Sequence, residues 1–229
     1  MSIAENCERV RERVARAAGK AGRDPSEITI VAVTKTHPAS KVAAAVRAGI
    51  EDVGENRVQE FLGKEKDVTV PCRWHLVGHL QTNKVNKVIG KFTLIHSVDS
   101  VRLIEKLSAS SEREGVVTDI LLEVNTSGEE SKYGIEPEEA ITLCSAAAGA
   151  PGVNLRGLMT VGPWTEDVAA VAKAFARLRR LAEDIDSRSM EGVSMEHLSM
   201  GMTDDFETAI AEGSTIVRLG RIIFGERGG

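Results

Sequence analysis

Residues 28–35 have the sequence ITIVAVTK, an apolar run that closes on a lysine and continues as THP. The run is apolar on consecutive positions, which is typical of a strand buried on both faces of a parallel sheet. A doubly wound open sheet would normally place a glycine-rich phosphate loop after such a first strand. Here VTKTHP stands in that place. The sequence therefore favours a closed barrel, with the open sheet as the alternative.

Seven further apolar runs follow, separated by amphipathic stretches with helix boundaries. Gly49 ends one such stretch as a C-terminal cap, and Pro137 lies near the start of another. The runs are EDVGEN (51–56), RWHLVGHL (73–80), FTLIHSV (92–98), TDILLEVN (118–125), VNLRGLMTV (153–161), VSMEHLS (193–199) and STIVRLG (214–220). Strands that alternate with helices pair in parallel through crossover connections. We predict an α/β protein: a single (β/α)8 barrel domain over residues 1–229, with the barrel at about 28–225 and an extra helix at about 2–22.

Composition argues against several classes of protein. A net charge of −5 and 3% aromatic residues disfavour a nucleic-acid partner. No apolar run approaches the about 18 residues that a membrane span needs. The N-terminal stretch contains Glu5, Glu8 and Glu12 and lacks the apolar centre of a signal peptide. We expect a cytoplasmic protein, and a monomer because a barrel closes its own sheet.

Metal sites and common catalytic motifs are missing from the sequence. The three cysteines are far apart, without zinc-binding spacing. His75 and His79 are four residues apart on a predicted strand, but no third ligand follows. No nucleophile elbow, phosphate loop or dinucleotide fingerprint is present. We predict no metal.

Polar residues close most of the predicted strands, at the end of the barrel where active sites lie. Val31, Val33 and Lys35 share a parity, so the lysine would point with the valines into the barrel. Partial desolvation there would favour the neutral, nucleophilic form of the amine, which Schiff-base chemistry requires. The alternative is a lysine whose side chain extends to solvent at the end of a strand. The strand ends, in order, are Lys35, Asn56, His79, Ser97, Asn125, Met159 with Thr160, Ser199 and Arg218.

The loops after the seventh and eighth strands, at 197–209 and 217–225, lie where barrels of this kind often bind phosphate. Ser199 offers a hydroxyl, and the backbone N–H groups of Gly220 and Arg221 begin a short final helix. Arg218 would supply a cation to an anion or a ring nitrogen. An ion pair inside the barrel is the alternative for Arg218.

Eight distinct motifs follow one another along the chain from about residue 28 to 225. They are IVAVTKTHP, GENRVQEF, WHLVGHLQTNK, HSVDS, EVNTSGEESKYGI, GLMTVGP, HLSMGMTDDFETAI and VRLGRIIFG. In this combination the chain closely resembles the pyridoxal phosphate homeostasis protein family. The resemblance implies the barrel of alanine racemase without its C-terminal β-domain. It also implies bound pyridoxal 5′-phosphate (PLP), a role in vitamin B6 and amino-acid balance, and PLP-dependent apo-enzymes as candidate partners.

The resemblance also implies site residues. Lys35 would form the Schiff base, Ser199 and the Gly220 loop would hold the phosphate, and Arg218 would face the pyridine nitrogen. An arginine there keeps that nitrogen unprotonated and weakens the ring as an electron sink. The complete implied set is Lys35, Asn56, His79, Met159, Ser199, Met200, Arg218, Gly220 and Arg221.

Three positions depart from the family pattern. Arg57 replaces a common aromatic residue, Thr203 replaces the usual serine, and Arg221 replaces a frequent small hydroxyl residue. The last departure leaves two alternatives for the Arg221 side chain, a charged phosphate contact or a position in solvent. The backbone N–H of residue 221 is available in either case.

Two classes of function remain after this comparison: a PLP carrier without enzymatic activity, and a PLP-dependent amino-acid racemase. Racemisation needs proton-transfer groups on both faces of the substrate, and Lys35 would supply one. The only tyrosine, Tyr133, follows the fifth strand, and nothing in the sequence directs it to the site. The sequence therefore favours the carrier.

Overall fold

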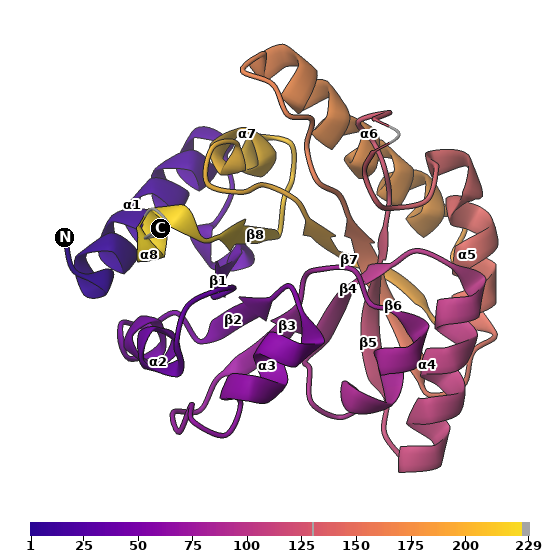
Figure 1. Ribbon diagram of the computed structural model, residues 1–229. Coiled ribbons are helices and arrows are strands. Elements are labelled where there is room, and N and C mark those ends of the chain that lie inside the picture. The colour runs from indigo at the N-terminus through magenta and orange to yellow at the C-terminus, as the bar shows by residue number, and fades with distance from the viewer. Residues whose placement is uncertain (130, 226–229) are drawn as a thin grey trace.

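The computed structural model describes residues 1–129 and 131–225, and eight parallel strands close into a barrel in chain order (Figure 1). The strands are β1 (Thr29–Val33), β2 (Asp52–Glu55), β3 (Arg73–Leu76), β4 (Leu94–Val98), β5 (Thr118–Glu123), β6 (Val153–Met159), β7 (Val193–Ser199) and β8 (Ile216–Leu219). Each lies within the apolar run that predicted it. The predicted (β/α)8 barrel is confirmed.

Helices connect the strands and cover the outside of the barrel (Figure 1). They are α1 (Ile3–Lys20), α2 (Ala39–Arg47), α3 (Val58–Lys64), α4 (Val101–Glu114), α5 (Ala140–Ala148), α6 (Val168–Ser187), α7 (Phe206–Ala211) and α8 (Arg221–Phe224), with 3-10 turns η1 (Pro25–Glu27), η2 (Thr82–Lys87) and η3 (Pro137–Glu139). The extra N-terminal helix α1 begins with a reciprocal cap between Ser2 and Glu5. It lies alongside α7 and α8.

One connection differs from the alternation of strands and α-helices that the sequence predicts. Between β3 and β4 the chain forms the 3-10 turn η2 instead of an α-helix, since the stretch TNKVNK contains two asparagines, which favour turns. After β7 the chain turns before helix α7 starts at Phe206. The Asp205 carboxylate accepts the N–H of Met202 and thereby stabilises a turn ahead of the helix.

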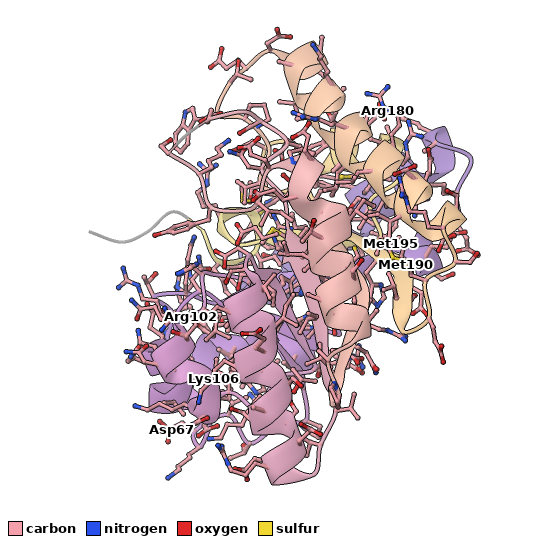
Figure 2. All side chains as sticks on the ribbon, turned by 90° about the vertical axis from the view of Figure 1, so that its right-hand side faces the viewer. Asp67, Arg102, Lys106, Arg180, Met190 and Met195 are labelled. Carbon is pink, nitrogen blue, oxygen red and sulfur yellow. The ribbon has the colours of Figure 1, made fainter. Side chains whose placement is uncertain are left out.

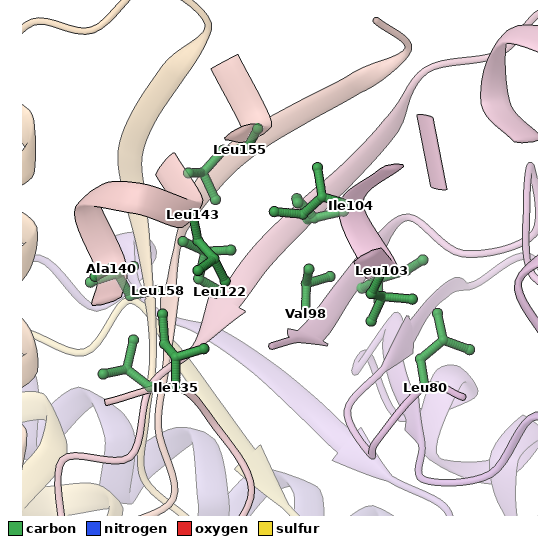
Figure 3. Packing of buried hydrophobic residues seen from close by; sticks show 14 of the residues in the cluster. Leu80, Val98, Leu103, Ile104, Leu122, Ile135, Ala140, Leu143, Leu155 and Leu158 are labelled. Atoms are coloured by element: carbon green, nitrogen blue, oxygen red, sulfur yellow. The ribbon is translucent and has the colours of Figure 1, made fainter. Parts of the chain in front are cut away.

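Both faces of the strands are buried, which explains the consecutive apolar runs. Leu122 and Leu158 point outward into a large cluster with Ile104 and Leu143 of the covering helices (Figure 3). Alternate residues point inward, so Leu121 packs inside the barrel. The inner apolar layer consists of Val31, Leu94, Leu121, Met159 and Ile216.

The outer faces of the helices are charged. Arg102 and Lys106 of α4 and Arg180 of α6 are exposed, whereas Met190 and Met195 pack partly buried against the core (Figure 2). In the described ranges no helix combines the length and apolarity needed to cross a membrane.

Candidate functional site

Lys35 lies two residues beyond β1, at the C-terminal end of the barrel. In the strand before it, Val31 belongs to the inner apolar layer, and a Cβ at Gly54 would lie 2.9 Å from its Cγ1. Lys35 is partly buried, and the next residue, Thr36, has a left-handed φ of 65°. The Glu60 carboxylate accepts the N–H of Thr36 at 2.8 Å, which stabilises this uncommon conformation. The loop is thus held in one defined turn.

Lys64 of α3 supports the same loop from outside the barrel. Its Nζ donates to the carbonyl oxygens of Thr34 and His37, at 3.0 and 2.8 Å, on either side of Lys35. The ammonium also contacts Glu55 Oε1 at 2.7 Å, and both side chains are buried. Burial raises the pKa of Glu55, while the hydrogen bonds from Lys64 and Thr34 lower it. The backbone around Lys35 is therefore fixed by a buried ion pair.

The loop after β8 lies against the Lys35 loop. The rings of His37 and Phe224 are 4.9 Å apart, and a Cβ at Gly220 would approach the carbonyl oxygen of Val33 to 3.5 Å. Within the described chain, the backbone N–H groups of residues 220–222 donate to no backbone or side-chain acceptor. Three unused donors therefore lie beside Lys35, where the sequence predicted an anion site.

Arg218 is buried inside the barrel, near the same end. Its Nη1 donates to Ser199 Oγ at 2.7 Å and its Nη2 to the carbonyl oxygen of Thr160 at 2.8 Å. Both acceptors are uncharged, so the ion-pair alternative is not the observed arrangement. Burial lowers the pKa of Arg218 to about 10, and the charges of Glu123 and Asp205 oppose this shift. The guanidinium remains protonated at neutral pH.

Glu123, which the sequence analysis did not single out, also faces the interior. It shares the inward parity of Leu121 on β5 and is 6% exposed. Its Oε2 atom is buried without a hydrogen-bond partner in the described structure. Burial raises the pKa of Glu123 to about 7, although Arg218 lowers it. An acid within the apolar run ILLEV was the signal that could have revealed it.

His79 lies at the rim of the barrel, just beyond β3. Its Nδ1 is 3.2 Å from Asp99 Oδ2, and its ring stacks on Tyr133 with centroids 4.6 Å apart. Tyr133 is 64% exposed. The structure thus brings Tyr133 to a predicted site residue, a contact that the sequence did not indicate.

Asn56 follows β2 and is half-buried. Its backbone lies against Gly78, where a Cβ would be only 2.3 Å from the carbonyl oxygen of Asn56. Glycine is therefore required at position 78 for this end of β2 to pack.

The remaining predicted residues divide into two groups. Met159 lies inside the barrel, in the apolar layer below the site. Met200, which the family resemblance places in the site, faces outward into the cluster that contains Phe175. The reason is the strand alternation, since Ser199 before it points inward.

Ser199 and Arg221, two residues of the predicted phosphate site, are bonded to other protein groups. The Ser199 hydroxyl is fully buried and bonded to Arg218 and to His96 Nδ1, so it is engaged within the barrel. The Arg221 guanidinium forms an exposed ion pair with Asp204, which corresponds to the solvent alternative. The unused donors at the predicted anion site are therefore backbone groups.

No cluster of three histidine, cysteine or acidic residues in the described structure is arranged to hold a metal. His75 and His79 have different surroundings: His75 bonds to Asp52 and His96 inside the barrel, while His79 lies at the rim.

The barrel is of the alanine racemase class, since residues 3–228 match the family model of the alanine racemase N-terminal domain. Alanine racemase of Clostridium difficile 630 shares the fold with a TM-score of 0.74 at 14% identity, covering 98% of this chain and 58% of that chain.

Closer similarity narrows the class. The pyridoxal phosphate homeostasis protein of Aquifex aeolicus (strain VF5) is 40% identical over 228 residues, 99% of each chain. PipY of Synechococcus elongatus PCC7942, solved with PLP bound, is 32% identical with a TM-score of 0.81, covering 93% of this chain and 100% of that chain. The chain therefore belongs to the pyridoxal phosphate homeostasis protein family.

Proposed function

We propose that this protein is a single-domain cytoplasmic carrier that binds PLP as a Schiff base on Lys35 and contributes to the balance of PLP and amino acids. One observation supports it above the others. The loop of Lys35 lies against the loop after β8, which offers three unused backbone donors at 220–222 and follows the buried cation Arg218. The names of the relatives and the PLP bound to PipY support the same ligand.

The chain offers a group for each part of the ligand. PLP supplies an aldehyde that condenses reversibly with amines. The Lys35 amine would attack the aldehyde carbon, lose its two protons as the C=N bond forms, and release the carbonyl oxygen as water. The N–H groups of residues 220–222 would bind the phosphate. Arg218 would donate to the pyridine nitrogen.

The charge of Arg218 favours a carrier over an enzyme. Although burial lowers the pKa of Arg218 to about 10, the guanidinium keeps its proton at pH 7, so it would donate a hydrogen bond to a ring nitrogen without protonating it. An unprotonated ring withdraws electrons weakly, which disfavours carbanion chemistry. The relatives are named as homeostasis proteins and not as enzymes. The three free thiols fit a reducing compartment.

A racemase-type activity is the second candidate, and one observation favours it. Tyr133 stacks on His79 at the rim, and Asp99 pairs with that histidine. A tyrosine there is a candidate for the second proton-transfer group.

The central test locates the adduct. The purified protein is incubated with PLP, reduced with borohydride and analysed by peptide mass spectrometry. We expect the reduced adduct on Lys35 and none in Lys35→Ala. No adduct, or an adduct confined to another lysine, contradicts the proposal. Lys35→Ala should retain weaker binding through residues 220–222; complete loss would show that these donors contribute little.

Activity is tested separately. Loaded protein is incubated with single amino-acid enantiomers in deuterated water, with Tyr133→Phe as the matched variant. Carrier function predicts no catalytic α-deuteration in either protein. Deuteration over many turnovers that Tyr133→Phe abolishes would establish the racemase candidate.

Transfer to PLP-dependent apo-enzymes and a monomeric state are further parts of the proposal. PLP transfer from the loaded protein to an apo-enzyme is compared in one solution and across a dialysis membrane. Transfer that occurs only in one solution shows that contact is needed. Analytical ultracentrifugation reports the oligomeric state.

A further inference from the structure

A line of hydrogen bonds crosses the inside of the barrel and ends on Arg218. Arg73 donates to both carboxylate oxygens of Asp52, at 2.8 and 2.6 Å. Asp52 Oδ1 is 2.9 Å from His75 Nε2, and His75 Nδ1 is 2.9 Å from His96 Nε2. His96 Nδ1 is 2.9 Å from Ser199 Oγ, which accepts from Arg218 at 2.7 Å. Beyond Arg73, every member is buried.

The two ends of the line determine the direction of its bonds. Arg218 can only donate, so Ser199 Oγ accepts there. Burial alone would raise the pKa of Asp52, but hydrogen bonds from His75 and Arg73 lower it to about 2. Asp52 is therefore a carboxylate, and His75 Nε2 must donate to it.

His96 connects the two ends. Burial lowers its pKa well below the ordinary value, so the ring is neutral and has a single N–H. If His75 Nδ1 is bare, His96 donates to it from Nε2 and accepts the Ser199 proton at Nδ1. One proton then serves each bond. In the opposite arrangement His96 Nδ1 would donate to Ser199 Oγ, and His75 would have to carry a proton on both ring nitrogens. The Ser199 proton would then lack His96 as its acceptor, inside a barrel that already contains the charge of Arg218.

We propose that Asp52, His75 and His96 are positioning residues for the PLP site. By accepting the Ser199 proton, the line leaves Ser199 Oγ with a lone pair toward Arg218, which fixes the guanidinium in the orientation needed to face the ring nitrogen. A hydroxyl with its proton toward the guanidinium would repel it. The bonds point in one direction and polarise one another, so the charge of Asp52 strengthens the last acceptor. The PLP part of this inference rests on the proposed function.

The order of Asp52, His75, His96 and Ser199 has the logic of a hydrolase triad with an extra histidine. The surroundings differ, because Ser199 is fully buried and its oxygen is bonded to Arg218. The line thus polarises an acceptor and does not prepare a nucleophile.

The direction of the line can be measured without PLP. Long-range 15N–1H spectra of histidine-labelled apo-protein identify the protonated nitrogen of each of the five histidines, assigned by single substitutions. We expect His75 and His96 both to have N–H at Nε2 and a bare Nδ1 at pH 7. A proton on His96 Nδ1, or a doubly protonated His75, overturns the inference whether or not PLP binds.

PLP binding tests the positioning role. Asp52→Asn should weaken PLP binding about tenfold and shift the absorption maximum of the bound form. Arg73→Gln changes the half-exposed end of the line of hydrogen bonds. It should change the PLP affinity and the absorption maximum in the same direction as Asp52→Asn, by a smaller factor. It keeps the test informative if Asp52→Asn does not fold. Ser111→Ala is the matched control, since it removes a buried bond of 2.7 Å to Thr118 that is not part of the line.

The outcomes separate cleanly. An unchanged affinity and spectrum in Asp52→Asn and Arg73→Gln overturns the inference. An equal effect of Ser111→Ala shows a merely structural role and overturns it too. If the wild-type protein binds no PLP, the proposed function fails, while the histidine spectra still decide the direction of the line.

Discussion

Lys64 Nζ and Glu55 Oε1 are 2.7 Å apart behind the loop that contains Lys35, and both side chains are buried. The second oxygen of Glu55 has no partner in the described structure. The Lys64 ammonium and the Thr34 hydroxyl, which donates to the same oxygen, therefore compensate a carboxylate removed from water. Lys64 also donates to the backbone on both sides of Lys35, so the same contact stabilises the fold and the loop of the proposed PLP lysine.

Lys64→Met should lower the free energy of unfolding by about 3–5 kcal/mol, because it leaves a buried charge unpaired. Urea denaturation measures this, and PLP affinity should fall with it. The double variant Lys64→Met/Glu55→Leu should recover much of the stability but not the affinity. Arg188→Met is the control, since its ion pair with Asp184 is exposed and should contribute less than about 1 kcal/mol. Equal losses in Lys64→Met and Arg188→Met would contradict the prediction.

Glu123 should make stability depend on pH. Its pKa rises from 4.5 to about 7 on folding, so the folded state binds the proton more tightly than the unfolded state. Stability from this group is therefore full below pH 4.5 and is lost as the pH rises through 7, by up to about 3 kcal/mol. Glu123→Gln should match the wild type near pH 4.5 and be more stable at pH 8. A difference in unfolding free energy that is the same at both pH values would argue against this.

Gly78→Ala should be destabilising, because its Cβ would meet the backbone of Asn56 at 2.3 Å. Forced repacking costs about 1–3 kcal/mol. Gly63→Ala in α3 is the matched control: nothing lies within 4 Å of a Cβ there, and alanine favours a helix. Thermal denaturation should show opposite signs for the two changes, and loss of stability in both would refute the packing argument.

Arg221→Ser should change little. The ion pair with Asp204 is exposed, so its loss should cost less than about 1 kcal/mol. The backbone N–H of residue 221 remains, and PLP affinity should stay within about threefold. A tenfold or greater loss would show that the guanidinium itself binds the phosphate.

The barrel could be predicted because its signals are local. A strand that is covered on both faces has an apolar run such as VNLRGLMTV, which contains the whole of β6. Glycine and proline mark the ends of the helices. The strand ends also predicted that Lys35 and Arg218 lie toward the same end of the barrel. Strand alternation also implies that Met200, which follows the inward-facing Ser199, points outward as observed.

The supporting contacts could not be predicted in the same way. Lys64 looks like any surface lysine of a helix until the barrel places it beside Glu55. The link from His75 through His96 to Ser199 depends on the register of three strands, which no single segment specifies. Tyr133 meets His79 only because two loops after different strands share a rim.

The register of Val31 beside Arg218 has a kinetic consequence. β1 pairs with β8, residues almost a whole barrel apart in sequence, and such long-range pairing forms late and slowly. On its other side β8 has a single register pair, Ser199 with Ile216. Lys35 after β1 and Arg218 on β8 therefore come together only when this long-range pairing has formed. PLP bound by both residues would recognise the closed barrel and stabilise the pairing of β1 with β8.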